Sequence, residues 1–372
     1  MIVGVPKEIK VQEHRVGLTP SSVRELIVHG HRVLVQSSAG AGIGFDDETY
    51  RRAGAEVVTS AQEVFEGAEM IVKVKEPQPQ ETALLSQGQV LFAYLHLAAD
   101  PRQTQALMDC GCMAIAYETV TDSRGGLPLL APMSEVAGRM SVQVGARCLE
   151  KSAGGGGMLL GGVPGVPSAK VVILGCGVAG GNALRMATGL EAQVTVIDRS
   201  LGRLAQLDEQ YGGRIQTLYS TTHNLEESVL EADLVIGAVL IPGAAAPKLV
   251  TREMIAAMRP GSAVVDIAVD QGGCLATTHP TTHDAPTYRV DGVVHYAVAN
   301  MPGGVARTAT MALNNATLPF TLTLADKGAW QAMADDPHLA RGMNVCRGQV
   351  THQAVARDLG LGYTPAERFL KG

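Results

Sequence analysis

A histidine stands near the end of an apolar stretch of this sequence. Residues 90–97 read VLFAYLHL, and the imidazole in this run belongs to His96. One interpretation is a core histidine whose ring nitrogens are satisfied by hydrogen bonds. The other is a catalytic histidine, because an imidazole with an unperturbed pKa of about 6.5 takes up and releases protons near neutral pH.

Other ionisable side chains follow strand-like runs in the first third of the chain. Arg15 lies in the segment after IVGVP (2–6), and Lys75 ends MIVKVK (70–75). In open α/β sheets, ligands bind beyond the carboxyl ends of the strands. Because Arg15, Lys75 and His96 all lie near such ends, we expect them to converge on one polar site.

A glycine-rich motif opens the second half of the chain. Gly175-Cys-Gly177-Val-Ala-Gly180 follows an apolar run and begins an amphipathic helix. Gly175 permits a tight turn, Gly177 lets backbone N–H groups approach a pyrophosphate, and Gly180 lets the helix pack closely on the sheet. The helix N-terminus favours phosphate. The alternative is a glycine-rich turn of a doubly wound fold without a ligand.

An acidic residue follows the glycine motif at the spacing expected for a dinucleotide site. Asp198 ends a second strand-like run, 23 residues after Gly175. Its carboxylate can accept hydrogen bonds from ribose hydroxyls and would repel a 2′-phosphate. We therefore expect the cofactor to be NAD rather than NADP.

Two polar residues follow strand-like runs of the second half. Asp270 comes after SAVVDIA (262–268), and Asn300 comes after VVHYAV (293–298). We expect a cleft between two domains to bring these residues opposite the polar groups of the first half. Hydride transfer needs a dry and fixed geometry, which a closing cleft provides.

Short β-branched runs alternate with helical patterns along most of the chain. This alternation predicts an α/β fold of two doubly wound domains, one a Rossmann domain and the other Rossmann-like, with the active-site cleft between them. We expect residues 1–130 and 305–372 to form the substrate domain and residues 131–304 the NAD-binding domain, because the tail from about 305 has a helical pattern with little strand character. The predicted strands are 2–6, 32–36, 55–58, 70–75, 90–97, 112–119, 170–175, 192–198, 214–220, 232–240, 262–268 and 293–298.

Local signals mark two helix starts and one loop. Thr19 followed by Pro20 is a typical N-cap with proline at the first helical position. Ser134 is a candidate cap for a helix over 134–151. Residues 152–168 are dominated by glycine and proline, and we interpret them as a boundary loop.

Composition restricts the class of partner. The 372 residues carry a net charge of −6, which gives no reason to expect binding to nucleic acid or to an anionic membrane. No segment approaches the roughly 20 apolar residues of a spanning helix, and the start lacks the apolar region of a signal peptide. The six cysteines contain no CxxC pair, which favours a reducing, cytoplasmic setting.

Two histidines four residues apart, His279 and His283 in HPTTH, have the spacing of metal ligands on a helix. However, proline and threonine separate them, and Asp284 is the one carboxylate or thiol near them at ligand spacing. We therefore predict no metal site.

Several longer motifs together resemble the L-alanine dehydrogenase family, over essentially the whole chain. The opening motif is shared with the nucleotide-binding subunit of transhydrogenases and with saccharopine dehydrogenases, whereas APMSEVAGRM and the pairing of His96 with Asp270 are narrower. The motifs are GVPKEIKVQEHRVGLTP, VKVKEP, LFAYLHLA, PLLAPMSEVAGRM, DIAVDQGG, TTHDAPTY and VVHYAVANMPGGVARTAT. The resemblance implies a homohexamer that binds NAD and reversibly oxidises L-alanine to pyruvate and ammonia.

The resemblance also implies roles for individual residues. His96 and Asp270 are implied to do the acid–base chemistry, and Arg15 and Lys75 to hold the substrate carboxylate. Residues implied around the rest of the substrate are Tyr94, Met133 and Asn300. Residues implied to contact the cofactor are Ser134, Gly175, Gly177, Val178, Ala179, Gly180, Asp198, Arg203, Ser220, Val239, Leu240, Ile267, Val298 and Met301. Some relatives bind a metal through a Glu and a His near TLTLADKGAW, but this stretch contains neither.

In the mechanism that we expect, NAD accepts a hydride from the alanine Cα, and water attacks the resulting iminium. His96 takes a proton from that water, and Asp270 stabilises the cationic imine. Lys75 is an alternative base if Arg15 lowers its pKa. Glu13 and Glu118 are interpreted as structural charges.

Two other functions compete with this one. A soluble transhydrogenase subunit would be expected to continue toward membrane segments and would not need the pair His96 and Asp270. A non-catalytic NAD-binding protein needs the glycines and Asp198, but it has no use for Arg15 and Lys75.

Overall fold

The computed structural model describes residues 1–239 and 246–370 of the chain. They form two compact units. The first unit contains Met1–Met133 and Val305–Gly372, and the second contains Ser134–Gly304. Within the described ranges, no helix is both long enough and apolar enough to cross a membrane.

The sheet of the first unit has eight strands among the described residues. Their order is β15-β14-β6-β5-β4-β1-β2-β3. The strands from β6 to β3 are all parallel, and β14 is antiparallel to β6. Read from β3, the parallel part has the order 3-2-1-4-5-6 that is typical of Rossmann folds. The strands are β1 (Ile2–Val5), β2 (Arg32–Gln36), β3 (Glu56–Val58), β4 (Met70–Val72), β5 (Val90–Ala93), β6 (Met113–Ala116), β14 (Met343–Cys346) and β15 (Gln349–Val350).

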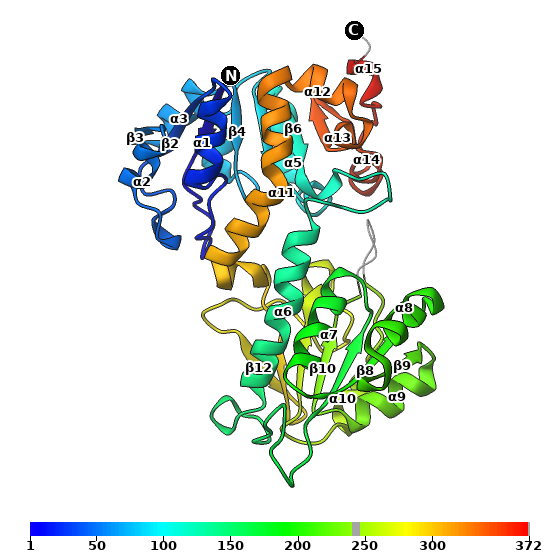
Figure 1. Cartoon of the computed structure of the whole chain (residues 1–372). Coiled ribbons are helices and arrows are strands. Elements are labelled where there is room, and N and C mark those ends of the chain that lie inside the picture. Colours follow the sequence, from blue (N-terminus) through cyan, green and yellow to red (C-terminus); the bar gives the residue numbers. More distant parts are fainter. Residues whose placement is uncertain (240–245, 371–372) are drawn as a thin grey trace. The chain divides into compact units, whose positions relative to one another are not determined.

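Helices from both ends of the chain pack on this sheet (Figure 1). Apolar side chains of α3, α5 and α14 form one core with the strands. The buried amide of Asn314 in α11 accepts the backbone N–H of Thr19 at 2.8 Å, which ties α11 to the start of α1. The helices are α1 (Pro20–Val28), α2 (Asp47–Arg52), α3 (Ala61–Gly67), α4 (Pro79–Thr82), α5 (Pro101–Cys110), α11 (Ala306–Lys327), α12 (Ala329–Asp335), α13 (Pro337–Ala340), α14 (Gln353–Leu359) and α15 (Glu367–Leu370).

The second unit contains a sheet with the order β12-β13-β11-β10-β7-β8-β9. Apart from the antiparallel β12, its strands are parallel and repeat the order 3-2-1-4-5-6, read from β9. The strands are β7 (Lys170–Leu174), β8 (Gln193–Asp198), β9 (Ile215–Tyr219), β10 (Leu234–Gly237), β11 (Ala263–Asp266), β12 (Thr287–Val290) and β13 (Val293–Tyr296). The helices after Ser134 are most of α6 (Ala131–Cys148), α7 (Val178–Gly189), α8 (Leu201–Tyr211), α9 (Thr222–Glu231) and α10 (Arg252–Ala257).

Both faces of the second sheet are covered by apolar side chains. Ile173 of β7 lies in one core with α7, whereas its neighbours Val172 and Leu174 lie in a second core with α9 and α10. Successive side chains of a strand point to opposite faces, so the apolar run of β7 is required by burial on both sides. The predicted doubly wound α/β class is confirmed.

Every run predicted as a strand contains one, but three strands were not predicted. They are β12, β14 and β15. The expectation of a tail with little strand character was therefore incomplete. The hairpin of β14 and β15 is short, and it holds the buried polar residue Asn344. Its strands exist because β14 pairs with β6, a partner more than two hundred residues away that no local pattern reveals.

The predicted helix starts had different outcomes. Thr19 caps α1, because its side chain accepts the N–H of Ser22, and Pro20 is the first helical residue. The prediction for Ser134 was wrong, because α6 begins at Ala131 and places Ser134 within its first turn. Pro132 is compatible with this earlier start because the first turn of a helix does not use its N–H groups. Apart from the end of the short 3₁₀ helix Lys151–Ala153, residues 152–168 form a loop, as expected, but they lie inside the second unit and not at a boundary.

Candidate functional site

Arg15 lies in a buried, preset position in the long segment between β1 and α1. Its side chain is 2% exposed. Its Nε donates to Glu13 Oε1 at 2.7 Å, and its Nη2 donates to Glu13 Oε2 at 2.5 Å. Burial disfavours the cation, but this forked pairing outweighs that effect and raises the pKa of Arg15. Glu13, expected to be only a structural charge, thus orients a predicted site residue.

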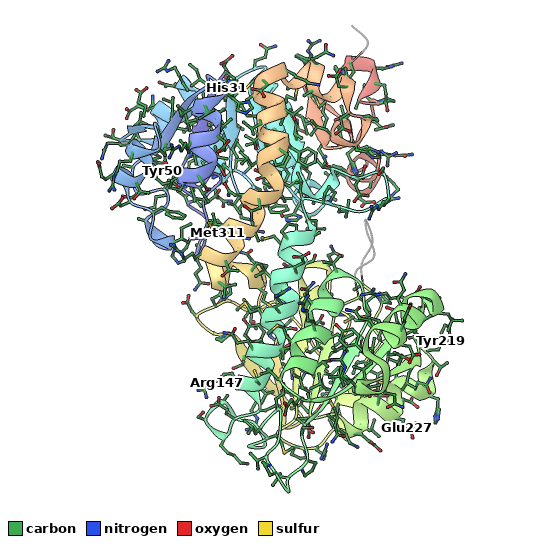
Figure 2. All side chains as sticks on the ribbon, viewed as in Figure 1. His31, Tyr50, Arg147, Tyr219, Glu227 and Met311 are labelled. Carbon is green, nitrogen blue, oxygen red and sulfur yellow. The ribbon has the colours of Figure 1, made fainter. Side chains whose placement is uncertain are left out.

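The segment that carries Arg15 is held from its far end as well. The hydroxyl of buried Tyr50, labelled in Figure 2, donates to the carbonyl of Leu18 at 2.9 Å. Together with the bond between Thr19 and Asn314, this contact fixes the end of the segment against two helices. The position of Arg15 therefore follows from packing in the first unit and requires no bound ligand.

Two other predicted substrate residues lie near Arg15. The Met133 sulfur is 3.1 Å from Arg15 Nη1. The Tyr94 ring is buried, and its oxygen is close enough to Arg15 that the guanidinium charge would favour the ionised phenol. The Tyr94 hydroxyl donates to the carbonyl of Leu129 at 2.5 Å, and burial raises its pKa. The structure thus brings Arg15, Tyr94 and Met133 together, with Tyr94 held as a neutral phenol.

The backbone at Lys75 is fixed by a buried ion cluster that the sequence reasoning missed. Lys73 Nζ lies 3.2 Å from Glu8 Oε2 and 2.7 Å from Glu81 Oε1, with all three side chains almost fully buried. Glu8 Oε1 also accepts the N–H of Val74 at 2.7 Å, and it lies 3.4 Å from the N of Lys75. The alternation in MIVKVK, which puts two lysines on one face, is the signal that could have revealed this cluster.

His96 is not a core histidine. Its side chain is 46% exposed, and its ring lies parallel to that of Tyr94 with centroids 5.9 Å apart. The backbone at His96 has φ 50°, a left-handed conformation that is rare outside glycine and recurs at functional sites. The strand predicted over 90–97 therefore ends early, at Ala93.

Glu118 holds the backbone at His96 in this conformation. Its Oε1 accepts the N–H of His96 at 2.6 Å and that of Leu95 at 3.2 Å. The same oxygen is 3.8 Å from Nδ1 of the imidazole. Glu118 follows β6, the neighbour of β5 in the sheet, which is why it reaches this turn. It too was expected only as a structural charge.

The glycine motif of the second unit has the geometry of a dinucleotide turn. Gly175 has φ 80°, in the left-handed region. A Cβ at Gly180 would lie 1.9 Å from the carbonyl oxygen of Gly175, whereas a Cβ at Gly177 would meet no atom within 4 Å. The turn is therefore tight where helix meets strand and open where a pyrophosphate would approach, at the N-terminus of the twelve-residue α7.

Asp198 lies beside this turn. Its Oδ2 accepts the N–H of Cys176 at 2.7 Å, and its Oδ1 accepts that of Ser200 at 2.8 Å. Each carboxylate oxygen keeps a second acceptor site for a ribose hydroxyl. Arg203 Nε donates to the Cys176 carbonyl at 2.8 Å, and the Ser220 N–H donates to the Asp198 carbonyl at 3.0 Å. These residues fit NAD.

The remaining predicted cofactor residues of the second unit follow the carboxyl ends of its strands or begin its helices. Val178 and Ala179 begin α7, and Val239 packs on Gly175. Ile267, Val298 and Met301 follow β11 and β13. Ser134 is one turn before Gly138, where α6 meets Ala179 so closely that a Cβ would lie 2.1 Å from its carbonyl oxygen. Leu240 lies outside the described residues.

Asp270 and Asn300 lie together at the same end of the second sheet. Asp270, in the short helix Ile267–Gln271, accepts the N–H of Asn300 on Oδ2 at 3.2 Å. Asn300 has φ 59°, and its carbonyl lies 3.2 Å from Nε2 of His283. The structure thus explains His283 of the HPTTH motif by a contact to the Asn300 turn.

The segment that carries Asp270 is anchored by Asp266, which the sequence reasoning missed. This buried carboxylate accepts the N–H of Ala268 at 3.1 Å, the N–H of Leu275 at 3.2 Å and the hydroxyl of Thr278 at 2.6 Å. In the part of the chain that the structure describes, no three metal-ligating side chains are grouped in a way that could hold a metal ion.

Two units share the same order of parallel strands. One contains a dinucleotide turn, and the other contains a preset Arg15 and a His96 with left-handed backbone. These features define the class of two-domain nucleotide-dependent enzymes. Residues 4–137 match the family "Alanine dehydrogenase/PNT, N-terminal domain", and residues 141–353 match "Alanine dehydrogenase/PNT, C-terminal domain". The chain belongs to the alanine dehydrogenase/PNT family.

Individual relatives are similar over the full length. The chain is 59% identical to an alanine dehydrogenase of Halomonas elongata over 370 residues, which cover 100% of both chains. It is 58% identical to one of Bacillus subtilis over 372 residues, or 100% of this chain and 98% of the relative. A solved L-alanine dehydrogenase matches with TM-score 0.94 and 54% identity over 97% of this chain and 99% of the other. A transhydrogenase from Sinorhizobium meliloti matches with TM-score 0.80 and 28% identity over 95% and 100%.

Proposed function

We propose that this chain is an alanine dehydrogenase. It converts L-alanine, NAD⁺ and water reversibly into pyruvate, ammonium, NADH and a proton. The observation that carries this proposal is the full-length identity of 58–59% with alanine dehydrogenases, against 28% with the transhydrogenase. The glycine turn and Asp198 support NAD as the cofactor. When bound, NAD⁺ supplies the hydride acceptor.

The cofactor would be held by groups that are already in place. The open side of Gly177 and the N-terminus of α7 suit the pyrophosphate, and the carboxylate of Asp198 suits the ribose. A buried cation would hold the substrate carboxylate. Arg15 is oriented by Glu13 before substrate arrives, so little entropy is lost when it binds an anion.

The acid–base work is assigned to His96 and Asp270. His96 takes a proton from the water that attacks the iminium and returns one to the departing amine, while Asp270 stabilises the cationic imine. Exposure of the imidazole and its held backbone support this role for His96. A homohexamer is part of the proposal as well.

The test is to mix the purified protein with NAD⁺ and L-alanine and to follow the absorbance of NADH. We expect NADH to form with alanine, but not with lactate, and more slowly with NADP⁺ than with NAD⁺. Binding of NAD⁺ without NADH formation would identify a non-catalytic binder, and hydride transfer from NADH to an NADP⁺ analogue would identify a transhydrogenase. Analytical ultracentrifugation measures the oligomeric state independently.

A further inference from the structure

A pair of cysteines occupies the turn between α5 and β6 in the first unit. Cys110 is the last residue of α5, Gly111 has φ 69°, and Cys112 precedes β6. The turn enters the sheet at the amino end of β6, next to the segment before β5, where the N–H of Gly88 donates to the Gly111 carbonyl at 3.1 Å. The turn therefore lies at the amino ends of the parallel strands, whereas Arg15 and His96 follow the carboxyl ends. The proposed dehydrogenase chemistry does not use it.

The two sulfur atoms converge on one backbone oxygen. Cys110 Sγ lies 3.3 Å from the carbonyl oxygen of Leu107, and Cys112 Sγ lies 3.8 Å from the same atom. The two thiols also interact with each other electrostatically. Cys110 is half-buried, whereas Cys112 is completely buried. The Cys110 sulfur is thus partly accessible, and the Cys112 sulfur is buried close to the same carbonyl oxygen.

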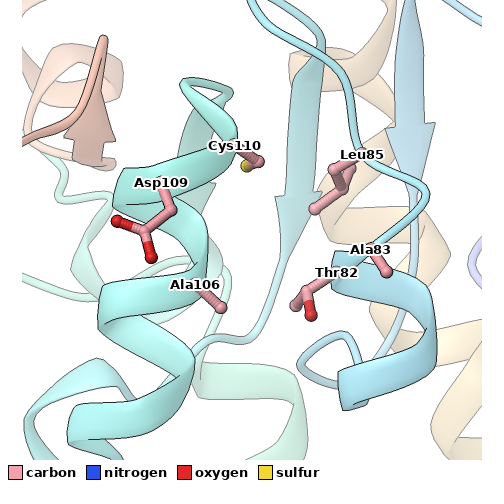
Figure 3. A pocket seen from close by; sticks show the side chains of 6 residues that line it. All are labelled: Thr82, Ala83, Leu85, Ala106, Asp109 and Cys110. Atoms are coloured by element: carbon pink, nitrogen blue, oxygen red, sulfur yellow. The ribbon is translucent and has the colours of Figure 1, made fainter.

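Cys110 opens onto a cavity. The cavity has a volume of about 440 Å³, and Figure 3 shows the α5 side chains of Asp109 and Cys110 across from those around the end of α4. Its lining residues are Thr82, Ala83, Leu85, Ala106, Asp109 and Cys110. A small solute can therefore reach the Cys110 sulfur without any movement of the sheet.

We propose that Cys110 and Cys112 form a thiol pair that reacts with peroxides, in which Cys110 attacks and Cys112 closes a disulfide. The Cys110 thiolate attacks one oxygen of a peroxide, the O–O bond breaks, and the leaving oxygen takes up a proton, which leaves a sulfenic acid on Cys110. The Cys112 sulfur then attacks the sulfenic sulfur, the S–O bond breaks, and water leaves with the Cys112 proton. With hydrogen peroxide, two thiols lose two electrons and two protons, and two waters form.

The electrostatics support this division of roles. The hydrogen bond from Cys112 lowers the pKa of Cys110 to about 7, although burial and the charge of Asp109 oppose the shift. The same bond, together with burial, raises the pKa of Cys112. A thiolate is the nucleophile in such reactions, so Cys110 is the attacking residue and Cys112 the resolving one.

The other cysteines provide internal controls. Cys148, Cys176, Cys274 and Cys346 are all buried, and burial raises the pKa of each. Cys148, with a pKa of about 11, would carry roughly 5,000-fold less thiolate than Cys110 at pH 7. Its higher intrinsic nucleophilicity recovers about 100-fold, so Cys110 should be alkylated roughly 50-fold faster than Cys148 in the native protein.

The experiment uses the full chain, iodoacetamide and hydrogen peroxide, with mass spectrometry of the tryptic peptide 103–124, which contains both cysteines. Native alkylation should favour Cys110 and increase as the pH rises through about 7. Peroxide treatment should make the wild-type peptide lighter by two hydrogens and block alkylation at both cysteines. In Cys112→Ser, a sulfenic acid on Cys110 should be trapped by a dicarbonyl probe, and in Cys110→Ser neither product should form.

NADH formation from alanine and a circular dichroism spectrum like that of the wild type show that each variant is folded. Cys112→Ala replaces Cys112→Ser if the buried hydroxyl prevents folding. The proposal is overturned if Cys110 is alkylated no faster than Cys148, if peroxide leaves both thiols free, or if Cys110→Ser still gives an oxidised Cys112. Oxidation of Met108 or Met113 adds oxygen to the peptide and is distinguished by mass.

Discussion

Glu13 is the residue on which the proposed binding of substrate by Arg15 most directly depends. It accepts hydrogen bonds from Nε and Nη2 of Arg15 inside the protein, so the guanidinium is aimed before any substrate arrives. A buried cation that loses its partner is also costly to the fold, by roughly 3–5 kcal/mol when the partner is removed entirely. Orientation and stability at Arg15 are therefore coupled.

We expect Glu13→Gln to raise the KM for alanine about tenfold while changing kcat much less, since the amide accepts one hydrogen bond but cannot match the fork of a carboxylate. Steady-state kinetics measure both constants, and a thermal melt separates misfolding from misorientation. Glu56→Gln, which alters an exposed ion pair with Arg32, is the matched control. An unchanged KM in a folded Glu13 variant would show that Arg15 does not depend on this pairing.

At the scale of single elements, two glycines at the junction of β7 and α7 have opposite surroundings. Gly177 precedes α7, and Gly180 lies in its first turn. A methyl group on Gly180 would collide with the Gly175 carbonyl at 1.9 Å, whereas one on Gly177 would enter open space. The first change alters the helix itself, and the second alters only the surface that a ligand would use.

We expect Gly180→Ala to lower both the melting temperature and the affinity for NAD⁺, because α7 must move away from β7. Gly177→Ala should weaken NAD⁺ binding by tenfold or more with little change in the melting temperature. Calorimetric titration with NAD⁺ and thermal melts of both variants check this pair of outcomes. Tight NAD⁺ binding by Gly177→Ala would place the pyrophosphate elsewhere.

The strand β13 contains a buried histidine, which makes the stability of the second unit depend on pH. Burial lowers the pKa of His295, whose Nε2 lies 2.8 Å from the hydroxyl of Thr277. An unfolded histidine gains its proton near pH 6.5, while the folded one resists until the pH is lower. The unfolded state therefore binds more protons in that interval, and the free energy of unfolding falls as the pH drops below about 6.5.

Replacement by His295→Gln keeps a hydrogen-bonding side chain but does not titrate. We expect the variant to lose part of the decrease in melting temperature between pH 7 and 5. His352→Gln provides the comparison in the first unit, because burial lowers the pKa of His352 as well. A His295 variant whose melting temperature falls as steeply as that of the wild type would contradict the assignment.

The sequence predicts an element well when a short local pattern determines it, and poorly when a distant part of the chain does. The parallel strands β1–β11 and β13, the cap at Thr19 and the glycine turn follow from short patterns, and the structure has all of them. The end of β5 at Ala93 did not follow, because the turn at His96 is imposed by Glu118 from a neighbouring strand. The roles of Glu13, Glu8 and Asp266 could not be predicted either, because they depend on which groups the fold brings next to each carboxylate.

At the scale of the whole molecule, the proposed reaction assigns its acid–base chemistry to two residues that are far apart in the sequence. If His96 and Asp270 act on the same substrate, each is of little use without the other. Groups that act as one catalytic unit show strongly non-additive losses when they are removed.

We therefore expect His96→Ala and Asp270→Asn each to reduce kcat by roughly 10²–10⁴-fold, and the double variant to lose little more than the worse of the two. The pH dependence of turnover in the single variants tests Lys75 as an alternative base, with Lys75→Met as the comparison. Losses that multiply in the double variant would mean that the two residues work in separate steps, and near-normal turnover in His96→Ala would remove it from the mechanism.

The pairing of β14 with β6 also determines when the first unit can be completed during synthesis. β6 is made early, but its neighbour on the sheet comes from Met343–Cys346, after the entire second unit has been translated. Protein domains generally fold as units as the nascent chain emerges from the ribosome. The second unit can therefore fold first, while the edge of β6 stays unpaired until the last part of the polypeptide has been synthesised. A stop codon shortly before Met343 would leave that edge permanently open to pairing with other chains, so aggregation is the expected fate of such a truncated product.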